Sequence, residues 1–152
     1  PSAIALSRQK VPYINPKNTR ENKCEKGAYV VNITSHENKV TLVASGTEVE
    51  LALKVQENLK QNNIHSKVVS MPCMEIFDKQ PESFRKDIID ENSLIVTLEA
   101  GSIISWQKFV ANKGINIGID QFGESAPYKD VYNQFGLSEE KITNLIQKKL
   151  IE

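Results

Sequence analysis

Short runs of hydrophobic residues recur along the chain, separated by polar and turn-forming residues, and they predict β-strands. Most of these runs show no alternation of polar and apolar positions. Continuous runs of this kind are typical of strands that are buried on both faces of a parallel sheet. The predicted strands cover residues 28–33, 40–44, 66–71, 93–100 and 115–120.

Helical periodicity fills the segments between and after these runs. Thr47 and Glu50 have the spacing of a capping box, which predicts a helix that begins there and extends to about Leu59. Other apolar residues recur at helical spacing in the later segments. These predict further helices over 77–89, 102–113, 128–135 and from Ser138 to the end of the chain.

The alternation of strands and helices predicts an α/β fold, a three-layer sandwich with helices on both faces of the sheet. Parallel strands need crossover connections, and the predicted helices supply them. The first two strands, 28–33 and 40–44, are separated by a short polar turn, so we expect them to form a hairpin. The expected sheet is therefore five-stranded and mainly parallel, with one antiparallel edge strand.

Size and charge restrict the possible partners. The chain has 152 residues, enough for one domain with its own core. Its 19 basic and 19 acidic side chains cancel and are interspersed, which argues against a nucleic acid or a membrane surface as partner. Cys24 and Cys73 are distant in sequence and have no CxxC spacing, so we expect free thiols and a cytoplasmic protein.

The first 27 residues differ from the rest of the chain. Residues 3–6 have the composition of the end of a strand, whereas residues 10–28 are polar and contain Pro and Asn, as linkers do. The chain opens without an initiator Met, which suggests a piece of a longer protein. We expect residues 1–27 to be the end of a preceding domain with an interdomain linker, and residues 28–152 to be the α/β domain.

The loops after the predicted strands contain the candidate chemistry, because ligands of open α/β sheets bind beyond the carboxyl ends of the strands. Glu99 and Glu124 could form an acid/base pair, although helix capping or hydrogen bonding to backbone amides is the commoner role of such residues. The stretch 45–47, Ser-Gly-Thr, could hold an anion at a helix start, but it lacks a phosphate-binding motif.

The remaining polar residues indicate no assembled catalytic machinery. His36 and His65 have no second ligand at the spacing of a metal site, so we expect both to be solvated. Trp106 has apolar neighbours at helical spacing, and we expect it to lie in the core. The residues alone therefore predict an α/β domain with a possible crevice.

A resemblance to a known family rests on five strings, LSRQ (6–9), ASGTEVELAL (44–53), VVSMPCMEIFDKQ (68–80), LEAG (98–101) and FGESAP (122–127). In this order and spacing they resemble the C-terminal domain of the transketolase family, over essentially the whole chain. The resemblance implies an enzyme of the pentose phosphate pathway that transfers a two-carbon ketol unit between ketose and aldose phosphates. It also implies thiamine diphosphate and Mg²⁺ as cofactors of a full-length, homodimeric enzyme.

The same resemblance assigns roles within the chain. Residues 1–9 would end the middle, pyrimidine-binding domain, and Arg8 matches the family's arginine that contacts the substrate phosphate. A guanidinium suits that role, although pairing with a carboxylate is the commoner use of such an arginine. The family holds its cofactors in other domains, and this chain has no Gly-Asp-Gly motif. We therefore expect the fragment alone to bind neither cofactor, to be inactive, and to contribute a phosphate contact and structural support for the dimer.

Alternatives stay open beside this interpretation. Ala28 stands where the family often has a glycine, and the tail after the last helix is short. The chain could be the C-terminal domain of a related thiamine-diphosphate enzyme. It could also be a regulatory module that binds an anion in the crevice around Gly46, Gly101 and Glu124, or a purely architectural domain.

Overall fold

The computed structural model describes residues 10–14, 22–110 and 113–152, and a five-stranded sheet forms its middle layer. The strands lie in the order β1-β3-β2-β4-β5. Four strands run parallel, and β1 runs antiparallel to β3 at one edge, which confirms the expected sheet. Their bounds are β1 (Tyr29–Ile33), β2 (Val40–Ala44), β3 (Ser66–Ser70), β4 (Leu94–Leu98) and β5 (Ile115–Ile117).

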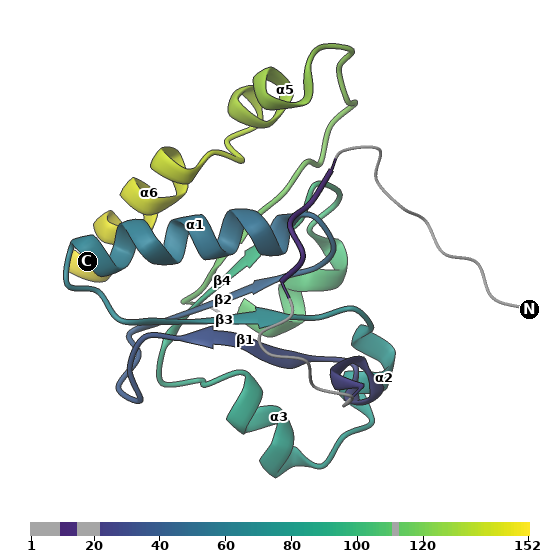
Figure 1. Cartoon of the computed structure of the whole chain (residues 1–152), viewed down its shortest axis with the longest axis vertical. Coiled ribbons are helices and arrows are strands. Elements are labelled where there is room, and N and C mark those ends of the chain that lie inside the picture. The colour runs from purple at the N-terminus through teal and green to yellow at the C-terminus, as the bar shows by residue number, and fades with distance from the viewer. Residues whose placement is uncertain (1–9, 15–21, 111–112) are drawn as a thin grey trace, which may run out of the picture.

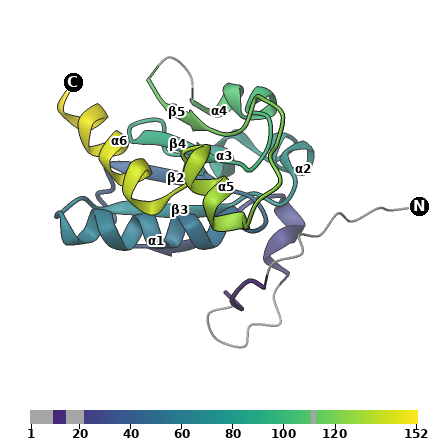
Figure 2. The ribbon, with the colours of Figure 1, turned by 90° about the horizontal axis from the view of Figure 1, so that it is seen from above.

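Helices cover both faces of the sheet, so the three-layer arrangement is confirmed (Figures 1 and 2). One face packs against α1 (Glu48–Gln61) and α6 (Glu139–Ile151). The short helix α5 (Tyr128–Gln134) lies on this side, near α1 and α6 (Figure 2). The other face packs against α2 (Met74–Asp78), α3 (Glu82–Ile88), the 3₁₀ turn η2 (Ile104–Trp106) and α4 (Gln107–Val110).

The central strand β2 shows why the hydrophobic run is continuous. All five of its residues are buried, and successive side chains point to opposite faces. Leu42 belongs to the core cluster under α1 and α6, whereas Val43 belongs to the cluster on the other face. A strand with helices on both sides therefore has no position that faces water.

The predicted hairpin between residues 28–33 and 40–44 is wrong, because β1 pairs with β3 and not with β2. The connection between β1 and β2 passes the start of β3, where the Thr34 and Lys39 amides donate to the carbonyls of Ser66 and His65. The buried strand β2 has parallel neighbours on both sides, β3 and β4, so no edge of β2 remains for β1. The partly exposed β1 takes the edge position instead.

The predicted capping box at the start of α1 does not form. Thr47 has helical backbone angles, φ −68° and ψ −27°, and its side chain caps no backbone amide. A capping residue needs an extended backbone to turn its hydroxyl toward the first turn. Thr47 instead donates to Glu48, and Glu50 pairs with Lys54 at 3.0 Å.

Two predicted helices are shorter or broken in the structure. The segment 77–89 contains the end of α2 and all of α3, which are separated before Pro81. The segment 102–113 begins later than expected, with η2 followed by α4. Trp106 is nevertheless buried in the core, as predicted, and Val110 is buried beside it. Within the described ranges, no helix is long and apolar enough to cross a membrane.

Candidate functional site

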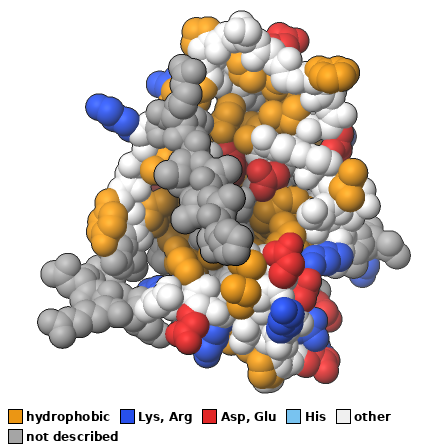
Figure 3. Space-filling view, turned by 90° about the vertical axis from the view of Figure 1, so that its right-hand side faces the viewer, with side chains coloured by type: hydrophobic (Ala, Val, Ile, Leu, Met, Phe, Trp, Pro, Cys, Tyr) orange, Lys and Arg blue, Asp and Glu red, His pale blue; other side chains and the backbone are white. Residues whose placement is uncertain are grey.

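The loops that follow β2 and β4 bring two acidic residues together at the carboxyl edge of the sheet, the edge where the parallel strands end. Ser45, directly after β2, joins them. Its hydroxyl donates to Glu99 Oε2 at 2.9 Å, and its carbonyl accepts the Glu48 amide at 3.1 Å. Figure 3 views the molecule from this edge, where hydrophobic side chains surround acidic ones.

Glu48 is the more deeply buried of the two, with 4% of its surface exposed. Its Oε1 accepts two hydroxyl hydrogen bonds, from Thr47 at 2.7 Å and from Tyr132 of α5 at 2.5 Å. The sequence analysis did not single out this residue. Its position held a signal, because Glu48 lies on the same helical face as the buried Ala52 and Val55.

Glu99 lies at the end of β4 and is partly buried. Burial raises the pKa of its carboxyl group, the hydrogen bond from Ser45 opposes that rise, and the negative charge of Glu48 adds to it. The indole of Trp106 also hydrogen-bonds to Glu99 and favours the ionised form. Glu99 therefore has a desolvated carboxyl group beside a second acidic residue.

The expected pairing of Glu99 with Glu124 is not formed. Glu124 lies in an exposed loop and accepts a hydrogen bond from Gln134 Nε2 at 2.7 Å. The contacts of Glu99 are with Ser45, Trp106 and Glu48. The commoner role of such residues, helix capping or hydrogen bonding to backbone amides, is also absent from the described contacts of Glu99 and Glu124. Both accept hydrogen bonds from side chains instead.

Acidic side chains flank the stretch 45–47, which could hold an anion according to the sequence analysis. Gly46 has a positive φ of 52° and open space where a side chain would lie. The helix that follows begins with the buried Glu48, and Gly101 lies so close to Glu99 that a Cβ added to this glycine would be 3.6 Å from Oε1. The Glu48 amide already donates to the Ser45 carbonyl, and the two acidic side chains make the surroundings unfavourable for an anion, so the geometry disfavours an anion site at this position.

A cavity of about 420 Å³ opens beside this cluster, between α1, α5 and the start of α6. Thr47 and Tyr132, which both donate to Glu48, belong to its lining. The described N-terminal segment, residues 10–14, passes the N-terminal end of α1 (Figure 1), and Lys10 and Val11 complete the wall.

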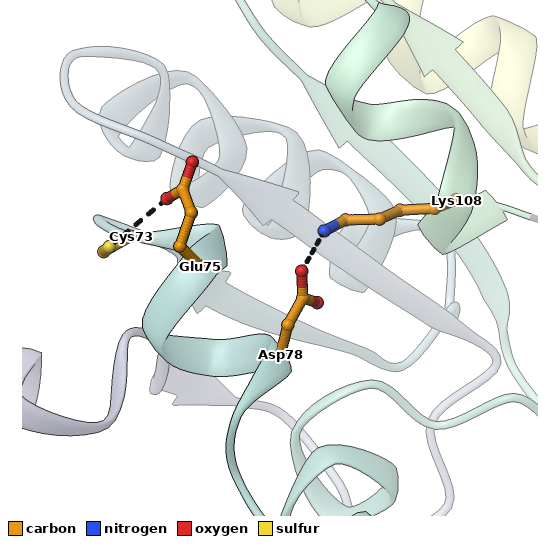
Figure 4. Close-up of polar contacts among 4 residues, drawn as sticks. All are labelled: Cys73, Glu75, Asp78 and Lys108. Atoms are coloured by element: carbon orange, nitrogen blue, oxygen red, sulfur yellow. Dashed lines mark hydrogen bonds and ion pairs between the residues drawn. The ribbon is translucent and has the colours of Figure 1, made fainter.

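Polar contacts on the opposite layer are structural in character (Figure 4). The Cys73 thiol donates to Glu75 Oε2 at 3.4 Å, and an ion pair joins Lys108 of α4 to Asp78 of α2. The pKa of Glu75 is lowered, first by a hydrogen bond from its own backbone amide and then by the Cys73 thiol. These contacts tie the short helices of this layer to each other and to the loop after β3.

The other candidates from the sequence are dispersed. Cys24 and Cys73 are free thiols, as predicted, and His36 and His65 are exposed. In the ranges 10–14, 22–110 and 113–152, no three His, Cys, Asp or Glu side chains come together as a metal site. Arg8 lies outside the described residues.

Comparisons with known proteins agree with the resemblance carried by the motifs. A family profile described as "Transketolase-like TK C-terminal domain" matches residues 27–138. The chloroplastic transketolase of Solanum tuberosum is 41% identical over 145 residues, which are 93% of this chain and 19% of the relative.

Solved transketolase structures share the fold. The crystal structure from Campylobacter jejuni superposes with a TM-score of 0.74 at 36% identity, over 82% of this chain and 19% of the other. The transketolase of Pichia stipitis in complex with sedoheptulose-7-phosphate gives a TM-score of 0.77 at 26% identity, over 85% of this chain and 18% of the other. The chain spans about a fifth of the length of the relatives that it matches. On these grounds the chain belongs to the transketolase family and corresponds to the family's C-terminal domain.

Proposed function

We propose that this chain serves as the C-terminal domain of a transketolase that transfers a two-carbon ketol unit between ketose and aldose phosphates in the pentose phosphate pathway. The observation that carries the proposal is the family match over residues 27–138, together with relatives that align over more than nine tenths of the chain. A related structure was solved with a sugar phosphate, which supports that substrate class.

The cofactors of such an enzyme do not fit the described residues. Thiamine diphosphate and Mg²⁺ require oxygen ligands for the metal and donors for the diphosphate. The described carboxylates at the carboxyl edge are bound to neighbouring hydroxyls, and no described cluster has the composition of a metal site. We therefore assign both cofactors to the remainder of a full-length homodimeric enzyme, and we propose that this chain alone is inactive.

Within this enzyme, the domain's proposed contribution to substrate binding is Arg8. A guanidinium has a permanent charge and a planar set of donors that matches phosphate oxygens. The carboxyl edge itself is acidic, at Glu48 and Glu99, and so it is a poor phosphate site. We therefore propose the phosphate contact in the segment that precedes the α/β domain, where residues 1–27 are proposed to end one domain and link it to the next.

The test of this role replaces Arg8 in a full-length transketolase that carries this domain. We expect Arg8→Ala to lower kcat/KM for a phosphorylated ketose donor, by an amount equivalent to about 1.5–3 kcal/mol of transition-state binding. The kcat/KM for an unphosphorylated donor should stay almost unchanged. Steady-state kinetics with both donors measures the difference.

The matched control is Lys10→Ala, which removes a nearby exposed cation. It should reduce kcat/KM for the phosphorylated donor much less than Arg8→Ala. Equal losses for both donors, or equal losses for Arg8→Ala and Lys10→Ala, would remove Arg8 from the phosphate site.

A further inference from the structure

Among the residues that the structure describes, helix α5 lies at the margin of the domain. It buries none of its seven residues, and the stretch 121–130, which includes its first turn, is exposed throughout. Tyr132 packs at the margin of the core cluster under α1, and its hydroxyl donates to the buried Glu48 at 2.5 Å. Other described bonds of α5, from Gln134 to Glu124 and from Lys141 to the Asn133 carbonyl, are exposed. The docking of α5 therefore depends strongly on Tyr132 and Glu48.

Glu48 and Glu99 lack a counter-charge among the described residues. The described ion pairs include neither of them. Their described partners are neutral groups instead, the hydroxyls of Ser45, Thr47 and Tyr132 and the indole of Trp106. Two neighbouring carboxylates, one buried and one partly buried, are costly when both are ionised and neither is paired with a cation. One proton on the pair removes that cost.

The other charged groups nearby are engaged elsewhere or lie at the surface. Lys54 of α1 bonds to Glu50 at 3.0 Å and to Glu139 of α6 at 3.5 Å. Asp120 accepts the Ile103 amide. Other charged side chains near α5 are exposed or line the rim of the cavity, among them Lys10, Glu124, Lys129, Asp130, Glu140 and Lys141. Glu57 and Lys60 of α1 are also exposed.

We propose that Glu48 and Glu99 form a proton-operated latch for α5. With one proton on the pair, at Glu99, the Glu48 carboxylate accepts the Tyr132 hydroxyl and holds α5 against α1. Loss of that proton places a second negative charge beside Glu48, and the repulsion releases Tyr132 and α5, which widens the cavity between α1 and α5. This latch goes beyond the proposed enzymatic role and does not depend on it.

The direction of the response follows from the surroundings of Glu99. Burial and the charge of Glu48 raise its pKa above the usual carboxyl value, against the opposing bond from Ser45. The latch is therefore closed at acidic pH and opens as the pH rises through the raised pKa. Trp106 is the only tryptophan of the chain, and its indole contacts the Glu99 carboxyl, so its fluorescence reports the ionisation of Glu99.

The test follows two signals of the 152-residue chain from below the usual carboxyl value of 4.5 up to about pH 8, the emission of Trp106 and the hydrogen-exchange protection factors of α5. Protection factors correct for the intrinsic pH dependence of exchange. We expect the α5 factors to fall about tenfold with the same midpoint as the Trp106 signal, while those of α1 stay constant. Glu99→Gln should abolish both transitions, and Glu48→Gln should move the Trp106 midpoint to lower pH.

Two further variants make the result decisive. Tyr132→Phe should leave the Trp106 titration in place but lower α5 protection at every pH, because the hydroxyl that bonds to Glu48 is lost while the ring is kept. Glu124→Gln, which removes an exposed carboxylate of the neighbouring loop, should behave as the wild type. The proposal is overturned if Trp106 titrates without any change in α5, or if α5 keeps its pH dependence in Glu99→Gln.

Discussion

Individual buried polar residues determine much of the electrostatics of this domain. Lys67 of β3 is 5% exposed, and its Nζ donates to the Asp87 carbonyl in the last turn of α3 at 2.8 Å. A cation at a helix C-terminus is favourable, yet loss of water lowers the pKa of this lysine despite the nearby Asp90 and Asp87. The residue therefore contributes one useful bond at an electrostatic cost.

The lowered pKa of Lys67 predicts that this residue makes the free energy of unfolding depend on pH. The folded-state pKa of Lys67 lies below its usual 10.5, so the unfolded chain binds more protons in that interval and Lys67 makes the free energy of unfolding rise with pH. Lys67→Met should lack this contribution, whose slope is at most about 1.4 kcal/mol per pH unit. Urea unfolding at several pH values up to 10.5 measures the difference from the wild type.

The comparison needs a control because other lysines titrate in the same range. Lys54 and Lys86 have raised pKa values and oppose the trend in both proteins. Lys60→Met, at an exposed position near the end of α1, should follow the wild-type curve. A Lys67→Met curve parallel to the wild type over the whole interval would contradict the assigned cost.

At the scale of elements, the hydrophobic pattern of the sequence predicts where most strands and helices lie. It does not predict which strands pair with each other. The five strands and the long helices α1 and α6 are predicted correctly, because most of them carry apolar residues at strand or helix spacing. The partner of β1 was missed, since the length of the turn after Ile33 does not reveal that β2 already has two parallel neighbours.

The candidate site is likewise predictable from the sequence only in part. The loop at 45–47 and Glu99 could be found from strand ends, but the partner of Glu99 could not, because Glu48 and Tyr132 are brought together by the packing of α5 against α1. Helical spacing alone would have placed Glu48 on the buried face of α1.

One element depends on a glycine that the family resemblance did not include. Gly27 ends the 3₁₀ turn η1 (Lys23–Lys26) with a φ of 82°, and a Cβ there would lie 2.4 Å from the Cys73 carbonyl and from the Phe77 amide. Gly136 has the same φ with open space around it. Gly136→Ala should cost about 1–2 kcal/mol of unfolding free energy for the backbone alone.

Gly27→Ala should cost about 1–3 kcal/mol more than Gly136→Ala, because the new methyl group must displace the backbone of α2. Denaturant unfolding of the two variants measures both costs. Similar losses would show that η1 does not pack against α2 as described.

On the scale of the whole molecule, the function proposed for this domain depends on parts of a transketolase that lie outside this chain. The chain spans about a fifth of its relatives, and its two faces are already filled by helices. The carboxyl groups of Glu48 and Glu99 bond to neighbouring side chains, and we propose that the ketol-transfer chemistry belongs to the remainder of the enzyme.

The most direct test of this account is a domain replacement. The part of the Solanum tuberosum transketolase that aligns with this chain, at 41% identity, would be replaced by it, and ketol transfer between sugar phosphates would be assayed alongside the 152-residue chain alone. Circular dichroism and sedimentation would confirm that the replaced enzyme is folded and assembled. The account predicts activity within about tenfold of the parent for the replaced enzyme and none for the chain alone. A folded, assembled enzyme without activity, or transfer by the chain alone, would contradict it.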